Sequence, residues 1–333
     1  MDVFELLKRL IAINSTSGEE LQVGEFLADY LSSTGFQVRL YEAEQKRPNV
    51  YAWRGDPRVV LSSHTDTVPP YIEFSEDDNY IYGRGACDAK GCIAAMIKAA
   101  EALIEAGRDG FGLLFVVGEE KGSIGAITAN QIPNKSRYLV NGEPTESKMI
   151  LGSKGGLKAR VRAQGRAAHS AYPELGESAI EKLLDMIQQV RQTSLPGNEI
   201  LGTATVNIGT ISGGIAANVL APEAEAEMLF RVVNNTAELK QIVESAAAGR
   251  ASVEYTFECE PVFMEHIEGM ETDVVSFTTD IPLLNRWGKP LLFGPGSIHD
   301  AHTEGEKISK LELAHAVGSY ANMVVRLQEK PLE

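Results

Sequence analysis

The sequence has few cysteines and no long apolar run, and both absences narrow the class of protein. Cysteine occurs at three positions among 333 residues: Cys87, Cys92 and Cys259. An odd number without framework spacing predicts free thiols and a reducing compartment, which favours the cytoplasm. No run of about 18 apolar residues occurs, so no transmembrane helix is expected. The N-terminus carries acids and lacks the basic and apolar regions of a signal peptide.

Basic residues are also scarce relative to acidic ones. The chain has 31 Lys and Arg against 46 Asp and Glu, a formal net charge of −15 at pH 7. Nucleic acids and anionic membranes are bound through basic faces, so neither is an expected partner. A hydrophobic content of 44% and a charged content of 23% are typical of a globular protein. The length allows two domains with a sizeable core.

The first part of the chain has the pattern of an α/β domain. Helical periodicity over 2–12 and 19–34, and again after Asp88, alternates with the apolar runs 59–61 and 111–117. Strands that alternate with helices predict a mostly parallel sheet covered by helices.

The pattern changes near residue 154, where apolar residues begin to alternate with charged ones. This alternation predicts half-exposed antiparallel strands and therefore an α+β insert. The chain then returns to α/β character, with a helix expected near 280–287 and another over 310–327. The expected division is an α/β domain of residues 1–153 plus 264–333, interrupted by a smaller domain of residues 154–263.

Acidic and histidine side chains gather where the expected strands end. The run 59–61 leads into His64 and Asp66, whose side chains point to one side of an extended segment. Asp88 follows a glycine-rich turn and precedes a helical pattern. Ligands bind at the carboxyl edge of open α/β sheets, so these residues form a candidate site. The other members of the set are Glu119, Glu120, Glu143 and His302.

The donor types in this set suit divalent metals. Imidazole and carboxylate groups without thiolates are ligands for Zn²⁺, Co²⁺ or Mn²⁺. The set supports two metals with three ligands each only if one carboxylate is shared. Two such cations about 3.5–4 Å apart activate water for hydrolysis. In an extended chain Glu119 and Glu120 cannot both face one metal, so one is expected to be a ligand and the other a general base.

Five motifs in order resemble the dinuclear-zinc aminoacylase/carboxypeptidase family, which includes acetylornithine deacetylase and succinyl-diaminopimelate desuccinylase. The resemblance covers essentially the whole chain and implies a zinc-peptidase-like catalytic domain with a lid. The motifs are Ser-His64-Thr-Asp66-Thr-Val-Pro, Gly-Arg-Gly-Ala-Cys-Asp88-Ala-Lys-Gly, Glu119-Glu120, Gly-Glu143-Pro-Thr and Gly-Pro-Gly-Ser-Ile-His-Asp-Ala-His302-Thr.

The resemblance implies a role for each residue of the set. His64 and Glu143 would bind one metal, Glu120 and His302 would bind the other, and Asp88 would bridge them. Two further roles are implied by the same motifs: Glu119 as general base and Asp66 as the residue that orients His64.

The insert resembles the lid of that family, which is also its dimerisation domain. His169 would stabilise the oxyanion, often from the partner subunit, while Asn218 and Arg231 would hold the substrate carboxylate. Purely structural alternatives stay open, with His169 as an ordinary lid histidine and Arg231 as a residue that only caps the lid sheet.

The resulting prediction is a cytoplasmic, homodimeric two-metal hydrolase with zinc, or else cobalt or manganese. The first hypothesis is an acetylornithine-deacetylase-like enzyme that cleaves the amide of a small N-acyl amino acid in arginine or lysine biosynthesis. A dipeptidase or carboxypeptidase of the same fold, acting on short peptides, is the nearest alternative. A non-catalytic metal-binding protein is less favoured, because a binder has no need of the base Glu119.

Overall fold

The computed structural model describes residues 1–331, which form two compact units. Unit 1 comprises Met1–Leu151, Met264–Asp273 and the chain from Thr279 onward, and unit 2 comprises Gly152–Phe263 and Val274–Thr278. Within residues 1–331, no helix is both long and apolar enough to cross a membrane.

Unit 1 is built on a six-stranded sheet in the order β1-β2-β6-β3-β7-β17. Strands β6, β3, β7 and β17 are parallel to one another, whereas β2 is antiparallel to both β1 and β6. The expected mostly parallel sheet is therefore confirmed. The strand bounds are Gln37–Glu44 for β1, Arg47–Arg54 for β2, Val59–His64 for β3, Phe111–Val116 for β6, Tyr138–Asn141 for β7 and Lys289–Leu292 for β17.

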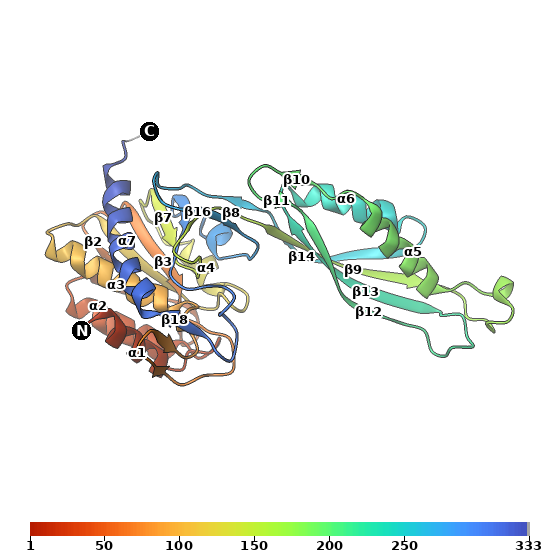
Figure 1. Cartoon of the computed structure of the whole chain (residues 1–333), viewed down its shortest axis with the longest axis horizontal. Coiled ribbons are helices and arrows are strands. Elements are labelled where there is room, and N and C mark those ends of the chain that lie inside the picture. The colour runs from red at the N-terminus through yellow and green to blue at the C-terminus, as the bar shows by residue number, and fades with distance from the viewer. Residues whose placement is uncertain (332–333) are drawn as a thin grey trace. The chain divides into compact units, whose positions relative to one another are not determined.

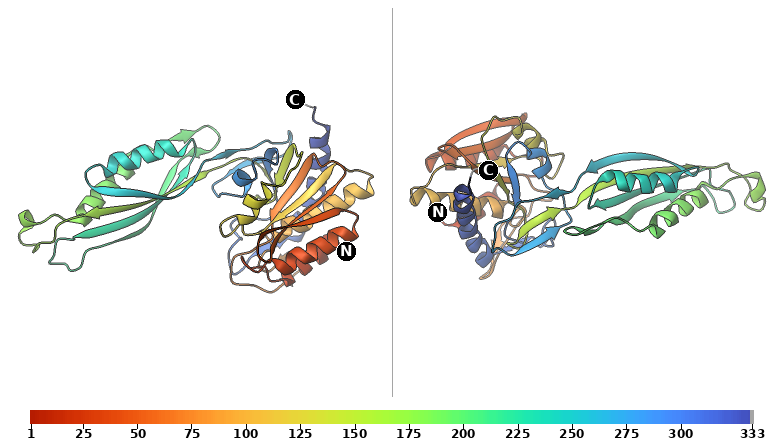
Figure 2. Two further views of the ribbon diagram at one scale, coloured as in Figure 1. Left: turned by 180° about the vertical axis from the view of Figure 1, so that it is seen from behind. Right: turned by 90° about the horizontal axis from the view of Figure 1, so that it is seen from above.

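Helices cover both faces of this sheet, which explains why its central strands are apolar without alternation. On β3, Val59 and Leu61 pack into the core under the larger helical layer, and Val60 packs into the core on the opposite face with Trp287. Figures 1 and 2 show the larger layer. Its helices are α1 (Val3–Ala12), α2 (Leu21–Ser33), α3 (Lys90–Glu105) and α7 (Lys310–Glu329), and α4 (Ile124–Ala129) covers the other face.

Helix α3 is the innermost helix of unit 1. Its sequence is apolar on nearly every side, and it packs against α1, α7 and the sheet. The flanking helices α1 and α7 begin at the caps Asp2 and Ser309, whose side chains accept main-chain N–H groups of the first turn. Because α3 starts two residues after Asp88, the packed helix holds the backbone that carries this carboxylate.

One expected helix is wrong. The segment near 280–287 contains only the short 3-10 helix η2, Ile281–Leu284. Gly288 adopts φ of 99°, which other residues rarely adopt, and turns the chain into β17. The sequence patterns also missed short elements that carry little periodicity. These are β4 (Ser75–Glu76), β5 (Tyr80–Tyr82), β8 (Met149–Ser153), β10 (Gly197–Asn198), β11 (Gly202–Thr203), β15 (Val262–Phe263), β16 (Thr272–Val275), β18 (Lys307–Ser309) and η1 (Pro173–Leu175).

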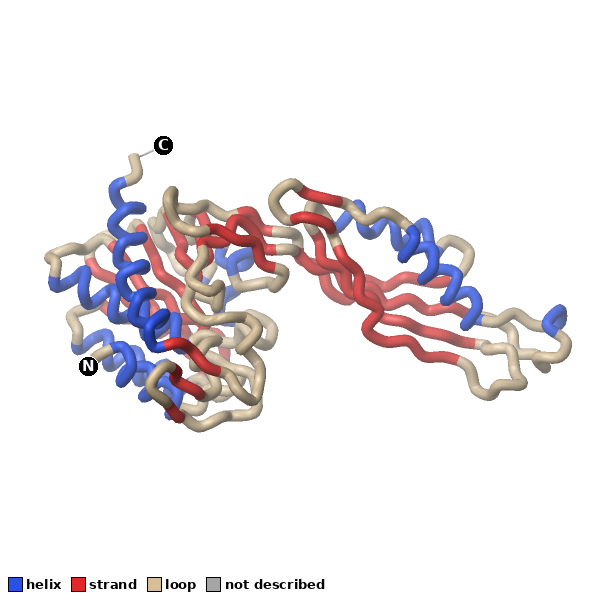
Figure 3. Tube along the Cα trace, in the orientation of Figure 1, coloured by secondary structure: helices blue, strands red, loops and turns tan. Residues whose placement is uncertain are grey.

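Unit 2 contains a four-stranded antiparallel sheet with two helices on one face (Figure 3). Alternate side chains of its central strands are buried against the helices, and those between them lie on the open face. The strands in sheet order are β12 (Thr205–Gly213), β13 (Glu223–Val232), β9 (Gly155–Gln164) and β14 (Ala251–Cys259), and the helices are α5 (Ala179–Gln192) and α6 (Thr236–Ala247).

Candidate metal centre

The parallel strands of unit 1 carry the expected ligands to one edge of the sheet. His64 is the last residue of β3, Glu119 and Glu120 follow β6, and Glu143 follows β7. His302 lies in the loop after β17. Because carboxyl ends of parallel strands meet at the same edge, residues distant in the chain become neighbours.

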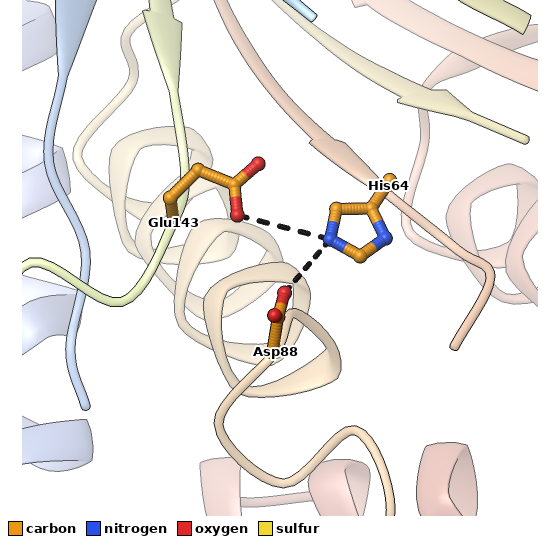
Figure 4. Close-up of side chains that lie close together, drawn as sticks. All are labelled: His64, Asp88 and Glu143. Carbon is orange, nitrogen blue, oxygen red and sulfur yellow. Dashed lines mark hydrogen bonds and ion pairs between the residues drawn. The ribbon is translucent and has the colours of Figure 1, made fainter. Parts of the chain in front are cut away.

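The first group joins His64, Asp88 and Glu143, shown in Figure 4. The Nε2 atom of His64 lies 2.9 Å from Asp88 Oδ1 and 3.8 Å from Glu143 Oε2. All three side chains are buried. Among residues 1–331, Glu143 Oε1 has no hydrogen-bond partner. A buried carboxylate oxygen left unpaired is costly, and a cation bound there would remove the cost.

The second group joins Asp88, Glu120 and His302. His302 Nε2 lies 3.2 Å from Asp88 Oδ2 and 2.8 Å from Glu120 Oε1. Asp88 therefore directs one oxygen to each histidine. A carboxylate between two ligand groups has the arrangement that a bridging ligand requires.

The third group joins His64 with both Glu119 and Glu120, which have ligand atoms within 4.8 Å of one another. The assumption of an extended chain at this point is therefore wrong. Gly118 has φ of 73° and begins a turn, and both following amides point toward Asp66. The N–H of Glu119 donates to Asp66 Oδ1 at 3.0 Å and that of Glu120 donates to Oδ2 at 3.2 Å.

Asp66 contacts His64 chiefly through its main chain. His64 Nδ1 lies 2.9 Å from the carbonyl oxygen of Asp66 and 3.5 Å from its Oδ1 atom. A proton on Nδ1 donated to that carbonyl leaves Nε2 with a free lone pair directed toward Asp88 and Glu143. The carboxylate of Asp66, fully buried, mainly holds the turn of Glu119 and Glu120.

The electrostatics of the cluster favour bound cations. Burial alone would raise the pKa of Asp88, but hydrogen bonds to His302 and His64 outweigh it and lower that pKa. Burial raises the pKa of Glu143 to about 7. Hydrogen bonds to Asp88 and Glu120 raise the pKa of His302 to about 10. The field that stabilises an imidazolium also attracts a divalent ion, which displaces protons as it binds.

The donor set fits the metals expected from the sequence. Each of the first two groups offers one imidazole and two carboxylates, and Asp88 belongs to both. Such donors suit Zn²⁺, Co²⁺ or Mn²⁺, and three protein ligands leave a position for water or substrate. Glu143 Oε1, which has no hydrogen-bond partner among residues 1–331, is a further oxygen atom that could bind a metal.

The three candidate residues expected to contact the substrate lie in unit 2 and do not form one cluster there. They are His169, Asn218 and Arg231. The exposed His169 and Asn218 are neighbours, since Ser170 N–H donates to the Asn218 carbonyl at 3.0 Å. Arg231 lies toward the other end of β13, opposite Gly156 of β9. At ~3.4 Å per residue, the strand from Glu223 to Arg231 spans roughly 27 Å. One copy of unit 2 therefore does not bring Arg231 to His169.

Two supporting residues were not singled out from the sequence. Ser17 donates its hydroxyl to Asp66 Oδ2 at 2.7 Å. Glu306 is buried and accepts main-chain N–H groups of the turn that ends in Asp88. The sequence signal for Glu306 was only that an acid stands four residues after His302. The turn that Glu306 contacts lies more than two hundred positions away in the chain.

The fold and the site define a metal-dependent hydrolase that acts on linear amides. The sequence profile of Peptidase family M20/M25/M40 matches residues 60–326. The chain belongs to this peptidase family.

Relatives at moderate identity cover nearly the whole chain. A peptidase M20 domain-containing protein of Schizosaccharomyces pombe is 41% identical, covering 97% of this chain and 84% of the relative. A probable carboxypeptidase of Aspergillus clavatus is 36% identical, covering 95% of this chain and 86% of the relative.

Solved structures show the same fold at lower identity. The aminopeptidase PepT from Bacillus cereus matches with a TM-score of 0.81 at 20% identity, covering 98% of each chain. A tripeptidase from Staphylococcus aureus matches with a TM-score of 0.80 at 22% identity, again covering 98% of each. This likeness confirms the expected fold class, and membership of Peptidase family M20/M25/M40 confirms the metal-dependent hydrolase class.

Proposed function

We propose that the chain is a two-metal carboxypeptidase or dipeptidase that hydrolyses short peptides with a free C-terminal carboxylate. The single observation that carries this proposal is the position of Asp88, whose two oxygens face His64 and His302 at 2.9 and 3.2 Å. This arrangement makes two three-residue ligand groups with one shared carboxylate. The names of the probable carboxypeptidases among the relatives support the choice of substrate.

The proposed ligands of one ion are His64 and Glu143, those of the other are Glu120 and His302, and Asp88 serves both. Bound divalent ions, most simply zinc with cobalt or manganese as alternatives, would polarise the scissile carbonyl and lower the pKa of water. The proposed base is Glu119, which takes a proton from the attacking water and delivers it to the leaving amine. Burial raises the pKa of Glu119, and this favours its acceptance of that proton.

Arg231 is the proposed partner of the substrate carboxylate. On the open face of unit 2, Lys158 and Arg160 pair with Glu227, and Arg162 pairs with Glu225. Among residues 1–331, Arg231 has no ion-pair partner, so its guanidinium remains available to an anionic ligand.

His169 is proposed to donate a hydrogen bond to the oxyanion, and Asn218, its neighbour, to bind substrate with it. The long separation of Arg231 from these two residues supports a homodimer, formed through unit 2, in which His169 serves the partner's site. A light-scattering mass of twice the chain mass is expected, and a monomer would contradict this assembly.

Deacylation of an N-acyl amino acid, as by acetylornithine deacetylase in arginine biosynthesis or by related enzymes in lysine biosynthesis, is the second candidate. The segment Gly294–His302 has the motif that favours it, and such a substrate offers the same amide and carboxylate as a dipeptide. The relatives' names support the peptidase instead.

The test is amine release by zinc-reconstituted protein, with a chelator-treated sample as control. The panel pairs dipeptides and tripeptides with their C-terminally amidated forms and adds N-acetylornithine and N-succinyl-diaminopimelate. Turnover of free-acid peptides and loss of it on amidation are expected, and Arg231→Met should reduce the preference for the free acid. Turnover of acylated amino acids alone would select the second candidate. No chelator-sensitive turnover would contradict both.

A further inference from the structure

Glu306 is a buried carboxylate that lies outside the proposed ligand set but contacts the turn leading to one ligand. Its Oε1 atom accepts the main-chain N–H groups of Gly85 at 2.9 Å, Cys87 at 3.2 Å and Asp88 at 3.1 Å. Its Oε2 atom pairs with Arg84 Nη1 at 2.5 Å, and neither side chain is appreciably exposed. One oxygen therefore collects three N–H groups of a single turn.

The same ion pair connects this turn to the loop that carries His302. Arg84 Nη1 also donates to the carbonyl oxygen of Thr303 at 3.2 Å. The N–H of Gly83 donates to the carbonyl oxygen of Glu306 at 3.1 Å. Two segments more than two hundred residues apart are thus joined beside the 3.2 Å approach of His302 Nε2 to Asp88 Oδ2.

His302 needs such support because its backbone conformation is unfavourable. Its φ is 63°, in the left-handed region that non-glycine residues rarely occupy. Its side chain is also 48% exposed, so packing alone constrains it little. A strained backbone persists only when its surroundings over-determine it.

We infer that Glu306 is a positioning residue that holds Asp88 and His302 as a pair of metal ligands. This inference rests on the proposed two-metal function. The competing explanation is that Glu306 only neutralises the buried Arg84. In that case metal binding would depend on the charge of residue 306 and not on the length of its side chain.

Two substitutions at Glu306 distinguish the effect of side-chain length from the effect of charge. Glu306→Gln removes the charge but keeps an oxygen at the same distance from the main chain. Glu306→Asp keeps the charge but withdraws the oxygens by about one C–C bond, 1.5 Å, beyond hydrogen-bond reach of the three N–H groups. The same two changes at Glu20 are the matched control, because Glu20 is equally buried and pairs with Arg47 at 2.6 Å.

The experiment titrates zinc into the apoprotein of each variant by calorimetry and measures urea unfolding of the same apoproteins. Positioning predicts that Glu306→Asp raises the zinc dissociation constant about 10–100-fold, with a smaller rise for Glu306→Gln. The Glu20 variants should lose stability and keep their zinc affinity. If Glu306→Asp does not fold, Arg84→Lys replaces it, since lysine keeps the charge but its one nitrogen cannot replace both Nη1, which donates to Glu306 and Thr303, and Nε, which donates to the Pro70 carbonyl at 3.2 Å.

Zinc affinity unchanged in Glu306→Asp, or in Arg84→Lys where that variant replaces it, would overturn the inference. A larger loss in Glu306→Gln than in Glu306→Asp would also overturn it, because charge would then be decisive. If the wild-type protein binds zinc and hydrolyses peptides, and these variants bind zinc normally, only the positioning role of Glu306 is rejected. Wild-type protein that binds no zinc rejects the proposed function and this inference together.

Discussion

Replacing Asp66 by asparagine tests whether its carboxylate supports the base or the histidine. The two oxygens accept from Ser17 Oγ at 2.7 Å and from the N–H groups of Glu119 and Glu120 at 3.0 and 3.2 Å. An amide has one acceptor oxygen, and its NH₂ group must face one of the two N–H donors. Losing one hydrogen bond to a charged acceptor and burying an unpaired donor should cost about 2–4 kcal/mol of unfolding free energy.

The catalytic effect follows from the position of Glu119. Misplacing a reacting group by about 1 Å costs on the order of 10²-fold in rate, so kcat of Asp66→Asn should fall by that order. Zinc content should be retained, because His64 Nδ1 is held 2.9 Å from the main-chain carbonyl of residue 66, which the substitution leaves in place. Ser17→Ala is the matched control, since it removes one bond to the same carboxylate and leaves both amides paired.

The stability effect should depend on pH. Burial would raise the pKa of Asp66, but its hydrogen bonds with His64, Ser17 and the Glu119 N–H lower it below its ordinary value. The carboxylate therefore stabilises the fold fully above about pH 4, the unfolded pKa, and loses this contribution as pH falls through the lower folded pKa. The difference in urea-unfolding free energy between wild type and Asp66→Asn should shrink below about pH 4.

Three measurements serve as assays: zinc content by mass spectrometry, kcat on a turned-over peptide, and urea unfolding. Loss of zinc from Asp66→Asn with normal kcat per bound zinc would refute the reasoning, because the carboxylate would then act through His64. Normal kcat and normal zinc content with reduced stability would limit Asp66 to a structural role.

Three further predictions concern the other proposed roles. Glu119→Gln should keep both zinc ions and lower kcat by about 10²–10⁴-fold, and near-normal kcat would remove it as the base. Asp88→Ala should impair both metal sites, so two tightly bound ions measured by calorimetry would contradict the shared ligand. His169→Ala and Glu119→Gln proteins, mixed under subunit exchange, should recover up to about a quarter of wild-type activity if His169 serves the partner's site. No recovery despite proven exchange would place His169 in its own site.

The ligand positions could be predicted because they are attached to strong patterns. His64 ends the strand that begins with the apolar run 59–61, Glu143 follows the apolar strand β7, and Asp88 lies two residues before α3, whose sequence is apolar on nearly every side. A buried strand has a fixed direction, so its last residues reach a definable edge of the sheet. The sequence thus indicates which residues meet there, without distances.

The Glu119–Glu120 turn could not be predicted in the same way. Its shape depends on two amides that bind a carboxylate more than fifty residues earlier, and on left-handed conformations at Gly118 and Ser123. Ser123 is not a residue that favours this region, so local propensity points elsewhere. Tertiary hydrogen bonds decide the backbone, and these are not encoded in hydrophobic periodicity.

Substrate preference is expected to depend on residues other than the proposed metal ligands. A scaffold that holds two ions at strand ends fixes the reaction class, because polarising an amide does not depend on its side chains. Among residues 1–331, the proposed substrate-binding residue Arg231 has no ion-pair partner, whereas the neighbouring Lys158, Arg160 and Arg162 are paired with glutamates. Its substitution is therefore the change from which a shift in substrate preference without loss of zinc is expected.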